Sequence, residues 1–159
     1  MHQFLAHLYT WSSHTRLSLA LSKSTWAFPV VETFHIVGMT LLLGSVLVLN
    51  LSILGVGLKK PAELAKDVGP FLLLGLGTML CTGIPMFMTS AGYYAPNPAF
   101  KIKMSLLVCA IVLQLAIHKV PGMYTGRLIG KVTAFFALLC WFTVAYAGRA
   151  IAFTNLFGA

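Results

Sequence analysis

Apolar residues gather into four long runs along this chain, and a short polar stretch separates each run from the next. A bilayer core of about 30 Å is crossed by about 20 apolar residues in a helix. The pattern therefore predicts four transmembrane helices, with a proline in the first turn of the first and a kink at Pro85 in the second. The predicted helices cover residues 28–58, 68–90, 101–119 and 132–153.

The connections between the runs are too short to hold a further domain, so residues 26–159 are expected to form one unit. We predict an all-α, integral-membrane, four-helix up-down bundle. Residues 1–25 mix leucines with His, Ser, Thr and Arg, and no apolar run there is long enough to span a membrane. This segment is predicted to be an amphipathic helix on the membrane surface, with Arg16 and Lys23 towards the headgroups.

Composition supports the membrane assignment. Hydrophobic residues make up 58% of the chain and charged residues 9%, with a mean hydropathy of +0.89. Soluble domains carry about a quarter charged residues, so an ordinary soluble enzyme is excluded. We expect a multi-pass protein of the bacterial inner membrane, in contact with the lipid bilayer and with other membrane subunits or further copies of itself.

The net charge of +8 does not call for nucleic acid as a partner, because most Lys and Arg residues lie at the ends of the apolar runs. Cations at such positions anchor spans at the interface. Six of them fall on the side of the first and third loops and five on the other. This small excess favours a cytoplasmic location for those two loops and an external one for both termini.

The cysteines Cys81, Cys109 and Cys140 all fall within apolar runs. An odd count without a C-x-x-C motif argues against disulfides and against a zinc site. They are predicted to be small buried apolar residues.

Ionisable residues inside the spans are the candidates for function, because a charge at membrane depth is costly. In an up-down bundle the start of the first and third helices and the end of the second and fourth share one side of the membrane. Five polar or sulfur-containing residues are thereby brought to similar depth: Glu32, His35, Met86, Lys103 and Arg149.

This inventory fits a b-type haem, with His35 as axial ligand and the cations of Lys103 and Arg149 pairing with the propionates. Met86, or His14 folding back from the surface segment, is the candidate second ligand. His118 is not, because about ten residues of depth, or ~15 Å, separate it from His35.

A structural role is the alternative for each residue taken singly. Glu32 fits the membrane interface, and Lys103 and Arg149 fit snorkelling to the headgroups. His35 fits a hydrogen-bonded packing histidine as well as a ligand.

Several short motifs together resemble a known family. They are Phe28-Pro29 with Glu32, His35, Gly38 and Gly44, then Thr82-Gly83, Tyr94, and Asn97-Pro98-Ala99-Phe100 with Lys103-Met104. Over about residues 26–119 the chain resembles an uncharacterised bacterial family of small four-helix integral membrane proteins, classed as a domain of unknown function. More distantly it resembles copper-resistance-D-like and four-helix b-type cytochrome membrane proteins. Family members often end the first helix on an acidic-Leu-Arg run, where this chain has Asn50-Leu51-Ser52.

The leading hypothesis from sequence is a membrane redox subunit that binds haem b and relays electrons within a larger respiratory or oxidoreductase complex. It predicts an electron-transfer or non-catalytic subunit rather than a stand-alone enzyme, with no catalytic residues. The first alternative is a scaffold or accessory subunit whose small residues Gly38, Ser45 and Ser52 pack against partner helices. The second is a small transporter or proton path.

Overall fold

A computed structural model describes residues 24–57, 59–89, 91, 97–120 and 122–156, with side chains up to Gly148. It contains four α-helices and, over these residues, no β-strand. The helices are α3 (Ala27–Leu54), α4 (Pro61–Thr89), α6 (Pro98–Lys119) and α7 (Leu128–Leu156). The predicted all-α four-helix architecture is therefore confirmed, whereas the predicted surface helix in residues 1–25 lies almost entirely outside the described residues.

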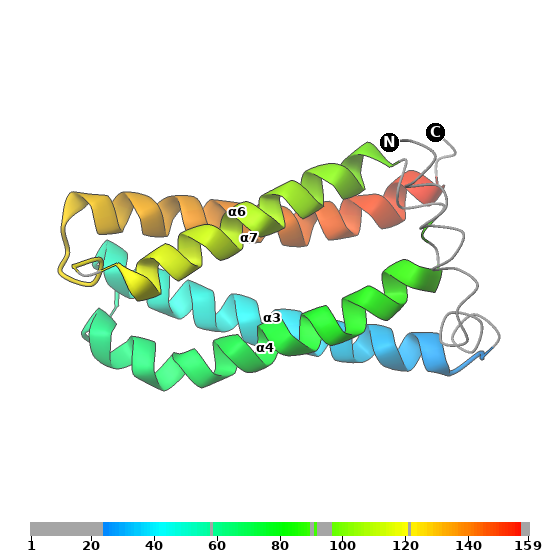
Figure 1. The fold of residues 1–159 in the computed structure, drawn as a ribbon, viewed down its shortest axis with the longest axis horizontal. Helices are drawn as coiled ribbons and strands as arrows, with labels where there is room; N and C mark the ends of the chain where they lie inside the picture. The colour runs from blue at the N-terminus through cyan, green and yellow to red at the C-terminus, as the bar shows by residue number, and fades with distance from the viewer. Residues whose placement is uncertain (1–23, 58, 90, 92–96, 121, 157–159) are drawn as a thin grey trace.

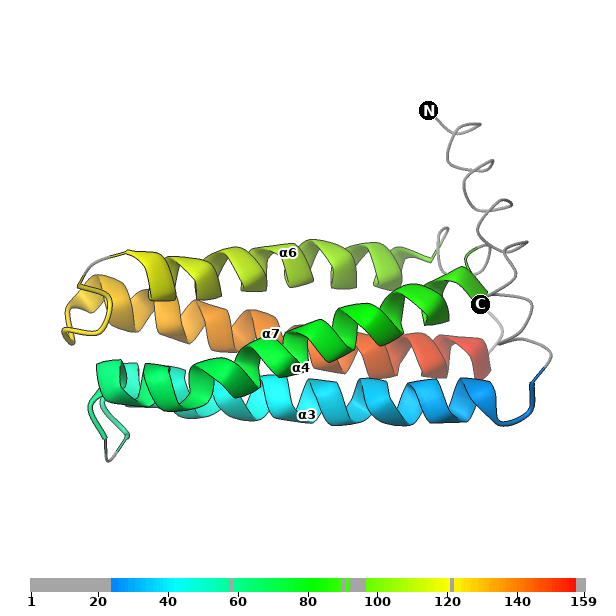
Figure 2. The same ribbon diagram turned by 60° about the horizontal axis from the view of Figure 1, so that its bottom comes forward.

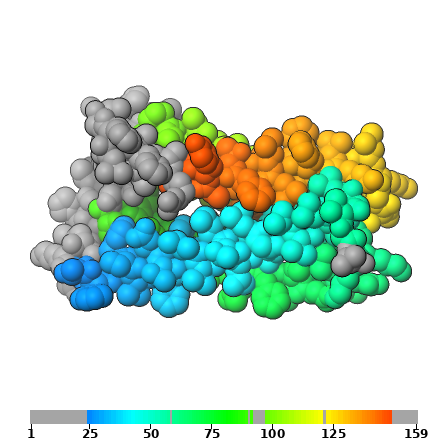
Figure 3. All heavy atoms as spheres, turned by 180° about the vertical axis from the view of Figure 1, so that it is seen from behind, coloured from blue at the N-terminus to red at the C-terminus, as the bar shows by residue number. Residues whose placement is uncertain are grey.

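The helices run alternately along one long axis (Figures 1 and 2). The start of α3, the end of α4, the start of α6 and the end of α7 lie at one end of the bundle, which we call the His35 end. Extended packing joins α3 to α4, α6 to α7 and α3 to α7. Figure 3 shows the last of these contacts, with α3 in blue and cyan against α7 in orange. The bundle is thus two antiparallel helix pairs joined through α3 and α7.

Local signals set the ends of the first helix. Ser24 Oγ accepts a hydrogen bond from the Ala27 amide at 3.2 Å, which satisfies one of the free donors of the first turn. Gly55 adopts a left-handed conformation with φ of 96°, and its amide donates to Ser52 O at 3.1 Å. Such a glycine ends a helix because other residues are strained there. Helix α3 therefore stops at Leu54, short of the predicted end at residue 58.

Helix α4 departs most from its predicted bounds, because it begins at Pro61 rather than at residue 68. The charged residues Glu63, Lys66 and Asp67 form its first two turns. The hydropathy pattern marks where a helix enters lipid, whereas the helix itself continues into the aqueous side. Two prolines lie within α4, at Pro70 and Pro85, and Figure 2 shows the helix bending along its length.

The third and fourth helices also begin earlier than predicted. Asn97 caps α6 by accepting a hydrogen bond from the Ala99 amide at 2.9 Å, and Pro98 occupies the first helical position. Helix α7 begins at Leu128, before the predicted start of the apolar segment at residue 132.

The surface of the bundle is apolar along the helices. Large side chains such as Phe34, Leu73 and Phe135 are more than half exposed. All four helices are long and apolar enough to cross a membrane. An apolar outer surface on such helices is what lipid contact requires, so this is a multi-pass membrane protein.

Two glycines set the distance between α3 and α4. A Cβ on Gly75 would lie 2.6 Å from the backbone nitrogen of Leu42 and 2.8 Å from the carbonyl oxygen of Gly38. The two backbones therefore touch, as small residues permit in membrane helices. This contact lies one turn from His35 and holds α4 against it.

Candidate functional site

The imidazole of His35 lies between α3 and α4. Its Nδ1 is 2.8 Å from the hydroxyl oxygen of Thr82. A Cβ on Gly83 would lie 3.2 Å from its Cε1, so the ring packs directly against the backbone of α4. Because Gly83 has no side chain, the ring fits there without displacing the helix.

The hydrogen bonds of Thr82 favour one tautomer of His35, the one that carries its proton on Nδ1. The Thr82 hydroxyl donates to the carbonyl oxygen of Thr78 at 2.6 Å. A hydroxyl has one hydrogen, so if Thr82 donates it to Thr78 O, its Oγ1 accepts from His35 Nδ1–H. The neutral ring keeps its lone pair on Nε2, which is the form in which histidine binds metals.

Lys103 reaches the same region from α6. A Cβ on Gly148 would lie 3.3 Å from its ammonium nitrogen, so this side chain crosses onto the last turns of α7. It is partly buried, and it lies near enough to His35 for their charges to interact. The sequence-based prediction that these two residues share one depth thus agrees with their places in the structure.

The other sequence candidates are arranged less favourably. Glu32 is exposed, although its carboxylate lies near enough to act on the charge of His35. Arg149 follows Gly148 in α7, but its side chain lies outside the described part. His14 also lies outside the described residues.

Met86 lies on α4 one turn beyond Thr82, on the face that packs against α3. The two ligands of a haem iron stand on opposite faces of the porphyrin. The His35 ring packs against the α4 backbone at Gly83, so as packed no porphyrin fits between this ring and α4.

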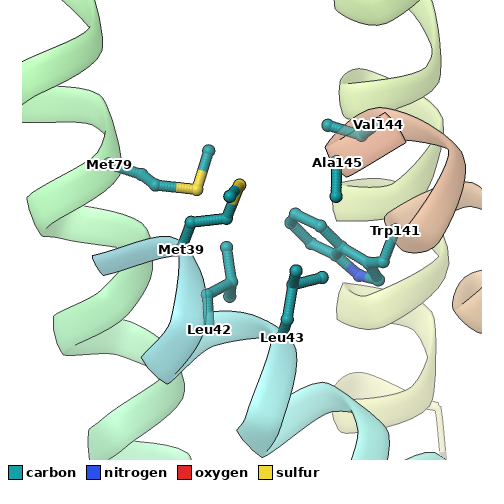
Figure 4. A pocket seen from close by; sticks show the side chains of 7 residues that line it. All are labelled: Met39, Leu42, Leu43, Met79, Trp141, Val144 and Ala145. Carbon is teal, nitrogen blue, oxygen red and sulfur yellow. The ribbon is translucent and has the colours of Figure 1, made fainter. Parts of the chain in front are cut away.

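A small apolar hollow opens one turn deeper than His35 (Figure 4). Its volume is about 190 Å³, counted out to the open surface. Residues of α3, α4 and α7 line it: Met39, Leu42, Leu43, Met79, Trp141, Val144 and Ala145. The hollow as packed does not have room for a porphyrin.

The model of a family of unknown function, DUF6644, matches residues 23–154. The chain belongs to the DUF6644 family. No curated protein and no solved structure matches it. The match covers α3, α4 and α6 of this DUF6644 protein in full and α7 up to residue 154, so the fold described here is that of the matched region.

A second polar site lies in the opposite half of the bundle and joins α3 to α6. The Asn50 amide nitrogen donates to Gln114 Oε1 at 3.1 Å, and both side chains are buried. His118, one turn further along α6, bonds the carbonyl oxygen of Gln114 through Nδ1 at 2.9 Å. Tyr124 packs edge-on against that ring, and burial raises the pKa of its phenol, which keeps it neutral.

Sequence reasoning missed Thr82 and Gly83 as partners of His35. Both were noted only as part of a motif, because a threonine in an apolar run has no distinguishing pattern. The one available signal was the adjacency of a hydroxyl and a glycine near the end of the second helix.

Proposed function

We propose that this DUF6644 protein is a redox subunit of a bacterial inner-membrane complex and that it binds a b-type haem through Nε2 of His35. The observation that carries the proposal is the chain of hydrogen bonds from His35 Nδ1 through Thr82 Oγ1 to Thr78 O, at 2.8 and 2.6 Å. Histidine ligands usually donate their other ring nitrogen in this way, which fixes the ring and raises its basicity.

Lys103 supports the same assignment. Its ammonium group lies in an apolar region and, among the described residues, forms no ion pair; the one such pair joins Lys59 to Asp67. A cation in this position favours an anionic partner, and a haem propionate is one that would come with an iron bound to His35. Arg149, next to Gly148 in the chain, is the candidate for the other propionate.

The donor set offers one ligand nitrogen and at least one cation for a propionate, but the hollow beside His35 does not hold a porphyrin as packed, so haem binding would require the side chains that line it to move apart. When bound, the haem would supply a one-electron couple. The chain would orient His35, exclude water with the apolar side chains of α3 and α4, and set the charge around the group through Lys103 and Glu32. His14, which lies outside the described residues, is the candidate for a second ligand from this chain.

Absorption spectroscopy tests the proposal on the full chain, purified from native membranes under conditions that retain cofactors. We expect a Soret band in the wild-type protein and its loss in His35→Ala. His118→Ala is the matched control, since it removes an imidazole from the opposite end of the bundle, and it should keep the band. A wild-type protein without a Soret band, or a band that survives His35→Ala, contradicts the proposal.

One observation favours an accessory role as the second candidate. The small residues Gly38, Ser45 and Ser52 are buried within the bundle, so they do not serve partner helices. Gly44 and Gly77 instead face outward, with no atom within 4 Å of a Cβ placed there. Outward glycines let another helix approach closely. Gly44→Leu with Gly77→Leu should release a co-purifying partner if this role holds, and unchanged co-purification would contradict it.

No observation favours the transporter or proton path. The polar groups near His35 and those near Asn50 are separated by an apolar layer that includes Leu42, Val46 and Leu107.

A further inference from the structure

Two of the three cysteines meet between α6 and α7. Cys140 Sγ lies 3.9 Å from Cys109 Sγ, close to van der Waals contact, and both thiols are free. The prediction that all three cysteines are buried is wrong. Cys81 and Cys109 are exposed, and Cys140 is partly buried. Residues 31 positions apart have no sequence signal that pairs them, whereas the α6–α7 hairpin brings them to the same level.

The pair lies at the centre of the membrane span. Cys109 is near the middle of α6, about 15 Å from either end of that helix. Its exposed neighbours on the outer surface are apolar, among them Val108, Val112 and Leu139. Cys109 thus opens towards lipid, where water-soluble oxidants and charged thiol reagents do not partition.

Helices α6 and α7 pack tightly beside Cys109 and Cys140. Ala110 and Ala137, which adjoin this level on α6 and α7, are fully buried. Small residues at a helix contact allow the backbones to approach closely. A disulfide needs an S–S distance of about 2.0 Å, so the sulfur atoms must approach by about 2 Å through side-chain rotation.

We propose that Cys109 and Cys140 form a lipid-facing redox dithiol, which a membrane-soluble oxidant of the quinone class converts to a disulfide between α6 and α7. Two S–H bonds break and one S–S bond forms. The two electrons and two protons pass to the quinone, which becomes a quinol. No net charge is left in the hydrocarbon, which is why this oxidant class suits a site at this depth.

The inference is independent of the haem proposal, because neither cysteine contacts His35 or its partners. The disulfide would fix α6 to α7 at mid-depth. Helix α6 carries Lys103 and α7 carries Trp141, so oxidation would restrain the wall of the bundle that faces α3 and α4.

Thiol counting on the full chain in lipid nanodiscs tests the proposal, with decylubiquinone as the oxidant. After denaturation and labelling with N-ethylmaleimide, the reduced chain takes three labels because it has three cysteines. We expect the oxidised chain to take one label and to recover three after treatment with a thiol reductant. Quinol should form in an equal amount.

Single substitutions supply the controls. Cys81→Ser, which removes the exposed cysteine of α4, should still lose both remaining thiols to the quinone. Cys109→Ser and Cys140→Ser should each keep their two remaining thiols, with circular dichroism confirming that the helices persist. Three labels after oxidation, addition of the quinone to a cysteine, or a crosslinked dimer in place of the internal disulfide would each overturn the proposal.

Discussion

The two polar sites of the bundle differ in how much of their hydrogen-bonding capacity is used. At one end, His35 is half buried, bonds the Thr82 hydroxyl through Nδ1 and lies near enough to the cation of Lys103 for their charges to interact. At the other, the amides of Asn50 and Gln114 are buried, neutral and bonded to each other. Burial with mutual pairing indicates a structural role, because such a pair fixes the register of two helices. An imidazole that is positioned through one ring nitrogen and keeps a lone pair on the other is instead able to bind a metal.

The amide pair is not fully satisfied. Asn50 Oδ1 and Gln114 Nε2 are buried without a partner among the described residues. One acceptor and one donor group of the pair thus remain without a partner among the described residues. Even so, neither carries a charge or a basic nitrogen.

The first prediction concerns the contact that positions His35. Gly75→Val should destabilise the protein by about 3 kcal/mol, because the new Cβ would meet backbone atoms of Leu42 and Gly38 that cannot rotate away. Gly77→Val is the matched control, since a Cβ on Gly77 meets no atom within 4 Å. Thermal unfolding in detergent measures both. Equal melting temperatures for the two variants would show that α3 and α4 are not in backbone contact.

The second prediction tests whether the Thr82 hydroxyl positions His35 for haem binding. Thr82→Val keeps the side-chain shape but removes the hydroxyl bonded to Nδ1. Haem affinity should fall about 10- to 100-fold, as when the outer hydrogen-bond partner of a ligating histidine is lost. Thr40→Val is the control, because Thr40 Oγ1 bonds only the Ile36 carbonyl oxygen of its own helix. Titration of the haem-free protein gives the affinities, and equal losses in both variants would count against the role of Thr82.

The third prediction tests the amide pair as a structural element. Asn50→Leu alone leaves the Gln114 amide buried without its partner and should cost about 1 kcal/mol, the usual scale for hydrogen bonds between membrane helices. Gln114→Leu should act similarly, and the double variant should cost less than the sum. Unfolding of the four proteins in a double-mutant cycle measures this coupling. Strict additivity would show that the two side chains do not interact, and a changed haem spectrum would remove the distinction between the two sites.

The fourth and smallest effect lies outside the membrane. Lys59 and Asp67 form an ion pair at 3.0 Å, with both side chains more than half exposed. Lys59→Ala should change stability by a few tenths of a kcal/mol at most, and by less in high salt. Chemical denaturation at two salt concentrations measures it. A loss above about 1 kcal/mol would mean that the α3–α4 loop depends on this pair far more than exposed pairs allow.

The sequence predicted the helices better than the contacts between them. Apolar run lengths gave four spans, and the depth of each residue followed from counting along them. This placed His35 with Lys103, because depth depends only on position in the chain. The first two helical turns of α4 are charged and lie outside the lipid, so the apolar pattern did not reveal them and α4 was predicted to start at residue 68.

Contacts between helices depend on rotation and spacing, which one sequence does not specify. The bond from His35 to Thr82 and the meeting of Cys109 with Cys140 both arise from the way α3, α4, α6 and α7 face one another. Gly38 was assigned to a seam for partner helices, yet its neighbour is Gly75 of the same chain. Periodicity indicated that one face of the first helix consists of small residues, but not which helix packs against that face.

The central claim is that Thr82 holds His35 with the proton on Nδ1 and the lone pair on Nε2. Nitrogen-15 NMR of the histidine-labelled, haem-free protein reads this tautomer directly, with His35→Gln used to assign the signal. The account predicts a neutral ring protonated at Nδ1. A ring protonated at Nε2 would contradict it, because Thr82 would then be the donor and the free nitrogen would not be available to a metal.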